Sequence, residues 1–359
     1  MRYTDQFDDN VDIYSSYQDI SSSSKPTKKK KKKNKKRKNT FLKVLVVILS
    51  LVLVASVALY SYAYYLINKI DRQPLEKDDL NITTNQYDSV KNIALLGIDS
   101  RKDNDSGRSD AVLILTIDKS HKKIKLTSIA RDSYVQIDGH SQDKLTHAYA
   151  YGKSELAVKT LNKNFDLEIT DYVTVNFFGF ARIIDYIGGV TIDVDQKEMN
   201  NLNSTIIPEI NKKGLPCEKI KKTGKQLLTG AQAMCYSRIR KVDSDIMRGN
   251  RQKEVLSAMF DKVKSMNITK LPALTEIILS ECKTSLSTND IMSMGMWAVA
   301  ASPEIVNLSI PNDNIKSSGQ IIRGVWYYVY DLETAKQEIK DFIFETGNYA
   351  PVEENTTSD

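Results

Sequence analysis

Three apolar runs decide the fold: NIALLGI at Asn92–Ile98, AVLILTI at Ala111–Ile117 and IKLTSI at Ile124–Ile129. Short apolar runs that are bounded by polar turns are typical of buried strands. Only the polar turn at residues 118–123 separates the second run from the third. We therefore expect three strands, of which the last two form an antiparallel hairpin.

Helices and further strands are expected to alternate after the hairpin. Apolar residues recur at helical spacing over Glu155–Phe165, and Phe180–Ile187 predicts a second helix, which two glycines end. Tyr172–Phe177, Val190–Val194 and Met234–Arg240 are strand-like. This pattern indicates an α/β fold in which a mixed β-sheet is flanked by helices.

One N-terminal segment is long enough to span a membrane. The 24 residues VLVVILSLVLVASVALYSYAYYLI at Val44–Ile67 carry no charge. At about 1.5 Å per residue they reach about 36 Å, which exceeds the roughly 30 Å of the hydrocarbon core. The length and the tyrosine-rich end favour an uncleaved anchor over a signal peptide. We expect one transmembrane helix over residues 41–67, ahead of the α/β domain.

A lysine-rich tail precedes this anchor. The first 40 residues hold 12 Lys or Arg against five Asp or Glu, whereas the whole chain has a net charge of only +6. From residue 44 onward there are 38 bases against 40 acids, which excludes a basic nucleic-acid-binding domain. The run KKKKKKNKKRK at Lys28–Lys38 is expected to contact anionic membrane lipid and to stay in the cytoplasm by the positive-inside rule. A nucleic-acid contact is the less favoured alternative for this run.

These features predict a single-pass protein of the cell membrane, with its N-terminus cytoplasmic and its C-terminal domain extracellular. The expected segments are a disordered basic tail at 1–40, the transmembrane helix at 41–67, a linker at 68–88, an extracytoplasmic domain at 89–347 and a disordered C-terminus at 348–359. Residues 268–347 contain no motif that we can interpret, and we assign them to the same domain.

The three cysteines, Cys217, Cys235 and Cys282, are too few and too widely spaced for a structural zinc site or a disulfide framework. A buried free thiol is expected at Cys235. One disulfide remains possible if the domain is exported, and the sequence does not choose the pair.

Arginine is informative because the chain strongly prefers lysine, with 39 Lys against 12 Arg. The guanidinium group binds phosphate through paired hydrogen bonds, which lysine cannot provide. On a strand Arg238 and Arg240 would share a face, and on a helix Arg248 and Gln252 would share another. Seven arginines lie at expected strand ends or helix starts, beside aspartates: Arg101, Arg108, Arg131, Arg238, Arg240, Arg248 and Arg251. They predict a phosphate site, and a surface salt-bridge network is the alternative.

Two aspartates are candidates for a metal site. Asp99 follows one expected strand and Asp110 begins the next, so their carboxylates can meet at an edge of the sheet. Mg²⁺, or Mn²⁺, is commonly held by one or two carboxylates while substrate phosphates complete its shell. The pair therefore predicts a divalent ion among the arginines.

The motifs of this chain resemble those of the LytR-CpsA-Psr (LCP) phosphotransferases of bacterial cell envelopes. The similarity covers the anchor and about residues 92–264. The motifs follow in family order: GIDSR (97–101), GRSD (107–110), SIARD (128–132), THAYAYG (146–152), DYIGGV (185–190), YSRIR (236–240) and RGNRQ (248–252). The resemblance implies a mixed sheet between helices with a lipid tunnel.

The resemblance also implies roles for single residues. The acids that hold Mg²⁺ in the family fall on Asp99 and Asp110. The pyrophosphate ligands fall on Arg108, Arg131, Arg238, Arg240 and Arg248 with Gln252 beside them, and Arg251 is an alternative to Arg248. Two positions depart from the family pattern, since Ala130 stands for the usual proline and Thr146 for the usual asparagine.

Several roles stay open in the sequence. We group Asp132 with Arg108 and Arg131 as catalytic, although an acid beside an arginine equally well positions that arginine. His147 could be a general base, but a structural hydrogen-bonding role is favoured. The residues expected to line a lipid tunnel, with the protein core as the alternative, are Phe177, Phe180 and Ile184.

The function that the resemblance implies is transfer of a phosphoglycosyl polymer from a polyprenyl-pyrophosphate carrier to the muramic acid hydroxyl of peptidoglycan. The expected partners are the lipid-linked glycan, peptidoglycan and membrane lipid, and no nucleic acid. The alternative is a non-catalytic membrane sensor that binds polyprenyl phosphates in the same pocket.

Overall fold

The computed structural model describes residues 33–69, 72–76, 79–82, 90–99, 107–239 and 245–346. The chain divides into two units, Met1–Ala58 and Leu59–Asp359, and we call the second the C-terminal unit. Helix α1 spans Lys33–Ile67, so it begins inside the stretch expected to be a disordered tail. Lysine is a good helix former, which lets an apolar helix continue into a lysine run.

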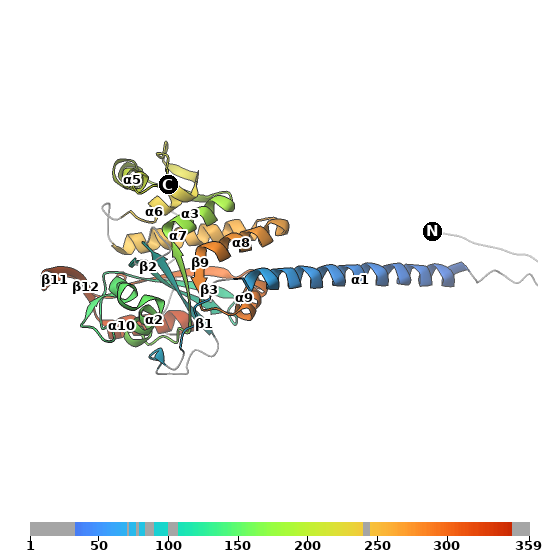
Figure 1. The fold of residues 1–359 in the computed structure, drawn as a ribbon, viewed down its shortest axis with the longest axis horizontal. Coiled ribbons are helices and arrows are strands. Elements are labelled where there is room, and N and C mark those ends of the chain that lie inside the picture. The colour runs from blue at the N-terminus through green and yellow to red at the C-terminus, as the bar shows by residue number, and fades with distance from the viewer. Residues whose placement is uncertain are drawn as a thin grey trace, which may run out of the picture. The chain divides into compact units, whose positions relative to one another are not determined.

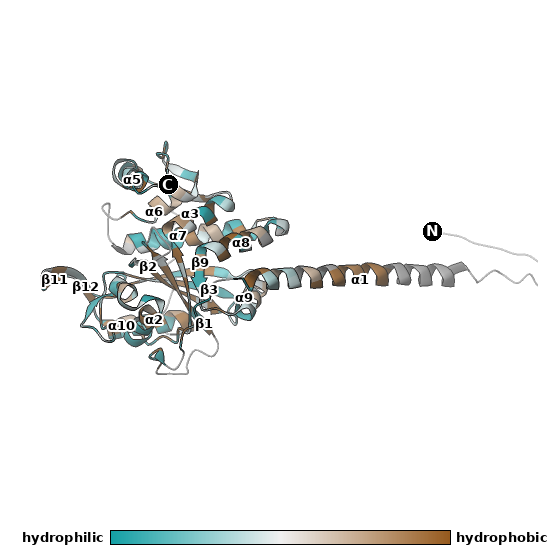
Figure 2. Ribbon diagram, viewed as in Figure 1, coloured by the Kyte–Doolittle hydropathy of each residue, from teal (hydrophilic) through white to brown (hydrophobic). Residues whose placement is uncertain are grey.

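The apolar part of α1 agrees with the expected anchor. Among the described residues, Leu45–Ile67 is the one helical stretch long and apolar enough to cross a membrane. Figure 2 colours much of this stretch as hydrophobic, and the side chains from Leu45 to Val54 are exposed. This indicates a single-pass membrane protein.

A six-stranded mixed sheet forms the centre of the C-terminal unit, in the order β10-β3-β2-β1-β6-β9. Its strands are β1 (Val90–Ile98), β2 (Ser109–Asp118), β3 (Lys123–Ile129), β6 (Asp171–Asn176), β9 (Cys282–Thr284) and β10 (Glu304–Ile310). The pairs β1/β2, β2/β3 and β6/β9 are antiparallel, whereas β1/β6 and β3/β10 are parallel. The three apolar runs thus form the strands β1 to β3, and the predicted hairpin is confirmed.

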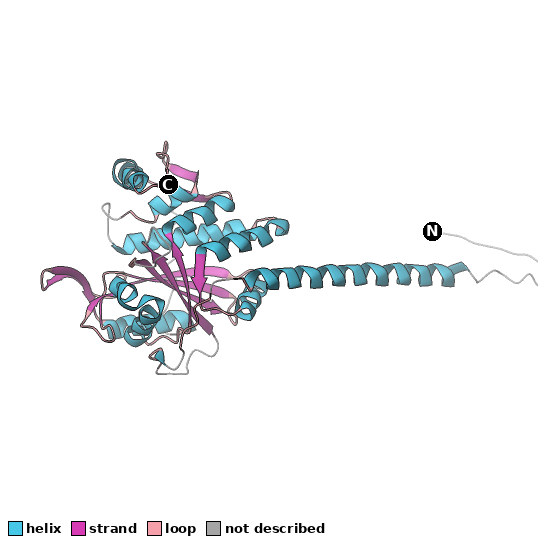
Figure 3. Ribbon diagram, in the orientation of Figure 1, coloured by secondary structure: helices cyan, strands magenta, loops and turns pink. Residues whose placement is uncertain are grey.

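Helices cover both faces of this sheet, as Figures 1 and 3 show. On one face lie α2 (Leu145–Phe165) and α10 (Leu332–Phe344). Their apolar side chains pack with those of β1 and β2, and Leu96, Ile114 and Leu161 are almost fully buried there. Burial of each such side chain contributes about 1.5–3 kcal/mol. The predicted α/β fold with a mixed sheet between helices is confirmed.

The opposite face carries α3 (Phe177–Tyr186), α6 (Gly230–Tyr236), α7 (Asp245–Lys264) and α8 (Leu271–Glu281). A second apolar cluster fills the space among these helices. The remaining helical elements are α4 (Gln196–Asn201), a π-helical turn (Leu202–Ile206), α5 (Ile207–Lys212), a 3₁₀ turn (Ile268–Lys270) and α9 (Thr288–Ala301).

Among the described residues, three small two-stranded sheets lie outside the central sheet. They pair β4 (Tyr134–Val135) with β5 (Asp143–Lys144), β7 (Val190–Val194) with β8 (Gly224–Leu228), and β11 (Ser317–Ile322) with β12 (Val325–Tyr330). The strand predicted at Val190–Val194 is confirmed, but it lies outside the central sheet. Residues 268–346 supply both edge strands of the central sheet and α10, so they belong to the same folded unit.

The strand predicted at Met234–Arg240 is wrong. Met234–Tyr236 belong to α6, and a turn follows. The signal for the helix lies just before it: the Thr229 side chain accepts from the Gln232 amide and the Gln232 side chain accepts from the Thr229 amide. This capping box begins a helix. Arg238 therefore lies in a turn, and Arg240 falls outside the described residues.

The described part of the expected linker packs against the C-terminal unit. Arg72 Nε donates to the Leu286 carbonyl at 3.1 Å. Leu80 is fully buried, and its carbonyl accepts from Asn162 Nδ2 at 2.8 Å. Residues 72–76 and 79–82 thus extend the fold rather than act as a free spacer.

Candidate functional site

The candidate site forms where three strands of the sheet end. Asp99 follows β1, Asp110 is the second residue of β2, and Arg131 lies two residues after β3. Because β2 pairs antiparallel with both β1 and β3, the start of β2 lies beside the ends of its neighbours. The predicted meeting of these residues at one edge of the sheet is therefore built into the topology.

Arg131 and Asp110 form the centre of the site. Arg131 Nη1 contacts Asp110 Oδ1, and Arg131 Nε lies 3.3 Å from Asp132 Oδ2. Asp132 Oδ1 accepts from Lys144 Nζ at 2.7 Å. Both aspartates are buried, so the Arg131 guanidinium group is positioned by two buried carboxylates.

Helix α7 supplies the second arginine. Arg248 is buried, and its Nη2 donates to the Asp110 carbonyl. Gly249 brings the helix close to β3, because a Cβ there would lie only 2.8 Å from Ser128 Oγ. An open pocket results, and its lining includes Asp110, Arg131, Arg248 and Gln252. The prediction that Arg248 and Gln252 face the same way is confirmed.

A second group of charges lies around Asp99. Arg238, in the turn after α6, places Nη1 3.8 Å from Asp99 Oδ1. Its guanidinium carbon lies 4.5 Å from the centre of the Phe177 ring. Arg108 is exposed, and its carbonyl accepts from the Asp99 amide at 3.1 Å. Arg108 and Arg238 therefore both neighbour Asp99.

Arg248 and Arg251, the two alternatives for a phosphate ligand, have different surroundings. Arg251 is buried, and its Nε donates to Glu198 Oε1 at 2.7 Å. Its guanidinium carbon also lies 5.9 Å from the centre of the Tyr236 ring. Arg248 lines the pocket, whereas Arg251 ties α7 to α4.

The two candidate metal ligands differ in exposure. Asp99 is exposed and Asp110 is buried, and each has an arginine beside it. Two carboxylates are the hard oxygen donors that Mg²⁺ or Mn²⁺ prefers, and a phosphate held by the arginines would complete the shell. The donor chemistry thus fits a divalent ion.

The three residues expected to line a lipid tunnel lie on α3. Ile184 is fully buried in the apolar cluster, whereas Phe177 and Phe180 are half-buried at its border. Of the three, only Phe177 lies directly against a candidate phosphate ligand, Arg238. Phe177 could therefore contact the lipid chain where it meets the phosphate.

Thr146 and Lys144 make polar contacts that the motifs do not reveal. Thr146, where the family usually has asparagine, donates its hydroxyl to the Ser109 carbonyl at 2.8 Å, and its amide donates to the Arg131 carbonyl at 2.9 Å. The motifs do not point to Lys144, because it belongs to none of them. These contacts hold the starts of β2 and α2 around Arg131.

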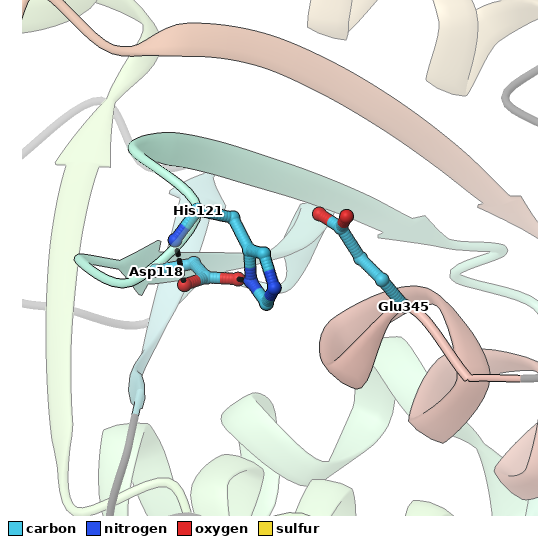
Figure 4. Close-up of side chains that lie close together, drawn as sticks. All are labelled: Asp118, His121 and Glu345. Atoms are coloured by element: carbon cyan, nitrogen blue, oxygen red, sulfur yellow. Dashed lines mark hydrogen bonds and ion pairs between the residues drawn. The ribbon is translucent and has the colours of Figure 1, made fainter.

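A separate cluster of titratable side chains lies at the other end of the β2–β3 hairpin (Figure 4). Ligand-type atoms of Asp118, His121 and Glu345 lie within 4.8 Å of one another. The ammonium group of buried Lys125 lies 2.8 Å from Asp118 Oδ2 and 3.0 Å from Glu345 Oε1, and it donates to the Ile343 carbonyl at 2.7 Å. A lysine thus neutralises these carboxylates, and the cluster joins the hairpin to the end of α10.

Comparisons with known proteins agree with this arrangement. Residues 54–342 match the model of the LytR_cpsA_psr family. The chain is 32% identical over 315 residues to the polyisoprenyl-teichoic acid–peptidoglycan teichoic acid transferase TagT of Bacillus subtilis, covering 84% of this chain and 92% of TagT. It is 32% identical to TagU of Oceanobacillus iheyensis, covering 72% of this chain and 77% of TagU.

Solved structures show the same fold. TagT bound to LI-WTA aligns with a TM-score of 0.60 and 30% identity, over 76% of this chain and 98% of that chain. TagT with bound octaprenyl pyrophosphate lipid aligns with a TM-score of 0.54 and 28% identity, over 73% and 92%. The chain belongs to the LytR-CpsA-Psr family.

Proposed function

We propose that this protein transfers a phosphoglycosyl polymer from a polyprenyl-pyrophosphate carrier to the muramic acid hydroxyl of peptidoglycan. The observation that carries the proposal is the pocket in which Arg131, Arg248 and Gln252 surround Asp110. Relatives that cover most of the chain are named teichoic acid transferases, and one solved relative holds octaprenyl pyrophosphate.

The arginines do most of the catalytic work. Arg131 and Arg248 reach the pocket from different elements, so they can hold two oxygens of one pyrophosphate from two directions. As the acceptor hydroxyl attacks the glycan-side phosphorus, negative charge shifts to the leaving polyprenyl phosphate. Fixed guanidinium groups stabilise that charge without reorganising, and such phosphoryl transfers depend mainly on positioning and electrostatics.

Asp132 acts through Arg131. Its carboxylate is buried between Arg131 Nε and Lys144 Nζ, at 3.3 and 2.7 Å. Each oxygen of this carboxylate already has a cationic side chain as its partner. We therefore assign Asp132 to the positioning of Arg131, one of the two roles that the sequence left open.

Asp99 and Asp110 would hold Mg²⁺ or Mn²⁺ beside the pyrophosphate. When bound, the ion would neutralise phosphate charge alongside the arginines. Arg108 and Arg238, which neighbour Asp99, would then contact the outer side of the pyrophosphate. The transferred polymer is a wall glycopolymer, and teichoic acid is the polymer that the relatives' names give.

The orientation in the membrane follows from the lysine run. Because Lys28–Lys38 precedes the apolar part of α1, Leu45–Ile67, we infer that the N-terminus is cytoplasmic and the C-terminal unit extracellular, where peptidoglycan lies. A reporter enzyme fused after Asp359 tests this. Activity only outside the cytoplasm is expected, and cytoplasmic activity would contradict the orientation.

The transfer itself is tested with the purified full chain in detergent, a lipid-linked wall glycopolymer and peptidoglycan strands. The expected products are polymer attached to peptidoglycan and free polyprenyl phosphate in equal amounts. Tight binding of the lipid without any release of polyprenyl phosphate would support the non-catalytic sensor instead.

A further inference from the structure

A set of aromatic side chains converges on one carboxylate next to the pocket. Asp143 Oδ2 accepts from Tyr151 Oη at 2.6 Å and lies 2.8 Å from His147 Nδ1, and Asp143 Oδ1 accepts from Tyr327 Oη at 3.1 Å. Burial by itself would raise the pKa of Asp143, but these hydrogen bonds and one from the Lys144 amide outweigh it and lower the pKa to about 2. The carboxylate therefore holds rings from α2 and β12 in fixed positions at neutral pH.

Two of the neighbouring aromatic side chains are exposed. Tyr151 is 48% exposed and stacks on His140, with ring centroids 4.3 Å apart. Trp326 is 44% exposed and stacks on Tyr328, with centroids 5.9 Å apart. We call Tyr151, Trp326 and Tyr327, together with Asp143, the aromatic cluster.

Gly319 on β11 leaves room for the Trp326 indole to lie close to the backbone. A Cβ at Gly319 would lie only 2.7 Å from Trp326 Nε1, so the indole lies against bare backbone. Exposed aromatic rings that are supported from behind in this way are typical of binding surfaces, because little side-chain entropy is lost when a ligand stacks on them. The β11–β12 hairpin thus carries a pre-organised platform.

The aromatic cluster connects directly to the phosphate pocket. Lys144 Nζ lies 5.8 Å from the ring centres of both Trp326 and Tyr327, and it donates to Asp132. Asp132 in turn contacts Arg131, and its carbonyl accepts from the Tyr328 amide at 2.9 Å. A ligand seated on the rings would therefore extend from the reacting phosphate.

We propose that the aromatic cluster is the acceptor subsite, which binds the uncharged sugar units of the peptidoglycan strand next to the attacking muramic acid. This inference rests on the proposed function. Sugar rings present C–H faces that pack on aromatic rings, and Lys144 can donate to their hydroxyl or acetamido oxygens. Rings that are about half open to water suit a soluble sugar better than a lipid chain.

The test is equilibrium binding of a peptidoglycan glycan fragment to the full-length protein, in variants of the two exposed rings. Trp326→Ala and Tyr151→Ala should each weaken binding about tenfold, whereas Trp326→Phe should keep most of it. Affinity for polyprenyl pyrophosphate should stay at its wild-type value in both alanine variants, and the melting temperature should stay unchanged in Trp326→Ala. Tyr151→Ala also removes a hydrogen bond to Asp143, so it is compared with Tyr151→Phe, which loses the same hydrogen bond but keeps the ring and should keep glycan binding. Val299→Ala, which alters an exposed apolar residue on α9, is the matched control and should change nothing.

Unchanged glycan binding in Trp326→Ala and Tyr151→Ala would overturn the subsite. It would also be overturned if these variants weakened binding of the lipid-linked polymer, of lipid vesicles or of a second protein copy instead. Wild-type polymer transfer is measured on the same preparation. Ring-dependent glycan binding without any transfer would contradict the proposed function but not the subsite, and transfer with ring-independent binding would contradict only the subsite.

A second inference comes from a different observation, a pair of buried cysteines. Cys235 Sγ lies 3.8 Å from Cys217 Sγ, and both thiols are free in this structure. We infer that this pair forms a disulfide when the C-terminal unit matures outside the cell. The two thiols would give up two electrons and two protons to a disulfide-bearing oxidoreductase, whose disulfide becomes two thiols.

Such a bond would connect residues that are 18 positions apart and would anchor α6, three residues before Arg238. The test is peptide mapping of protein purified from the cell surface, alkylated under denaturing conditions without reductant. The expected result is a linked Cys217–Cys235 peptide, and reduction should lower the melting temperature by about 5 °C or more. Complete alkylation of both cysteines without reduction would overturn the inference.

Discussion

Arg131 Nη1 contacts the Asp110 carboxylate at the point where β2 begins and the β2–β3 hairpin has just ended. Arg248 Nη2 donates to the carbonyl of the same aspartate. Asp110 therefore joins two arginines that come from different parts of the chain. This arrangement gives Asp110 both a structural role and a role in the proposed chemistry, while Asp99 is exposed.

The two candidate metal ligands should accordingly behave differently on substitution. Asp99→Ala should remove the dependence on divalent ions and leave stability unchanged. Asp110→Ala should do the same but also lower the free energy of unfolding by about 1.5–3 kcal/mol, because Arg131 loses a charged partner in a buried site. Urea unfolding and Mg²⁺ titration of transfer measure the two effects. Normal Mg²⁺-dependent turnover in both variants would exclude the metal assignment.

Substitution of Arg248 should affect transfer, whereas substitution of Arg251 should affect stability. Arg248→Lys keeps a charge but loses the planar fork, so we expect much weaker transfer with a nearly unchanged melting temperature. Arg251→Ala leaves Glu198 buried without its charged partner, which should lower the free energy of unfolding by about 3–5 kcal/mol. The double variant Arg251→Ala/Glu198→Gln should recover part of that loss. If Arg248→Lys were fully active, the pocket would not be the phosphate site.

Substitutions of two α3 residues, Ile184 and Phe177, should likewise separate an effect on stability from an effect on lipid binding. Ile184→Ala creates a cavity in a fully buried position and should cost about 2–5 kcal/mol of stability, whatever the substrate. Phe177→Ala should instead weaken binding of long-chain polyprenyl pyrophosphate, because Phe177 lies against Arg238 at the border of the cluster. Binding assays with short and long prenyl chains measure this. Equal loss for both chain lengths would show that Phe177 does not contact the lipid chain.

The low pKa of Asp143 predicts how stability responds to acid. Burial opposes ionisation, yet the hydrogen bonds from Tyr151 and His147 prevail, and the folded pKa of about 2 lies below the unfolded value. The stabilising effect is therefore present above about pH 4 and is lost as pH falls toward 2. Asp143→Asn should be less stable than wild type at pH 6, and the difference should shrink at pH 2.5. A difference in urea midpoint that is independent of pH would contradict this account.

The sequence predicted the central sheet well because β1, β2 and β3 are continuous apolar runs, which few other structures accommodate. It also grouped Asp110, Arg131, Arg248 and Gln252, and all four line one pocket. Motif order supplied most of that success, since strand ends and helix starts that are distant in sequence meet at one edge of the sheet.

The failures have physical causes. Met234–Arg240 is too short for its periodicity to distinguish strand from helix, and the capping box at Thr229 and Gln232 was the better signal. The roles of Asp132 and Lys144 depend on contacts between segments that no spacing reveals. The pairing of Cys217 with Cys235 likewise depends on how α6 packs.

An arginine that forms paired hydrogen bonds with phosphate in this pocket is proposed to drive phosphoryl transfer. Single-turnover release of polyprenyl phosphate tests it most directly, with Arg131→Lys compared with wild type. Arg182→Lys is the matched control, because Arg182 is exposed and pairs with Glu281 on α8. We expect a rate lowered by about 10²–10³ in Arg131→Lys with an unchanged melting temperature, and a wild-type rate in Arg182→Lys. A wild-type rate in Arg131→Lys would contradict it.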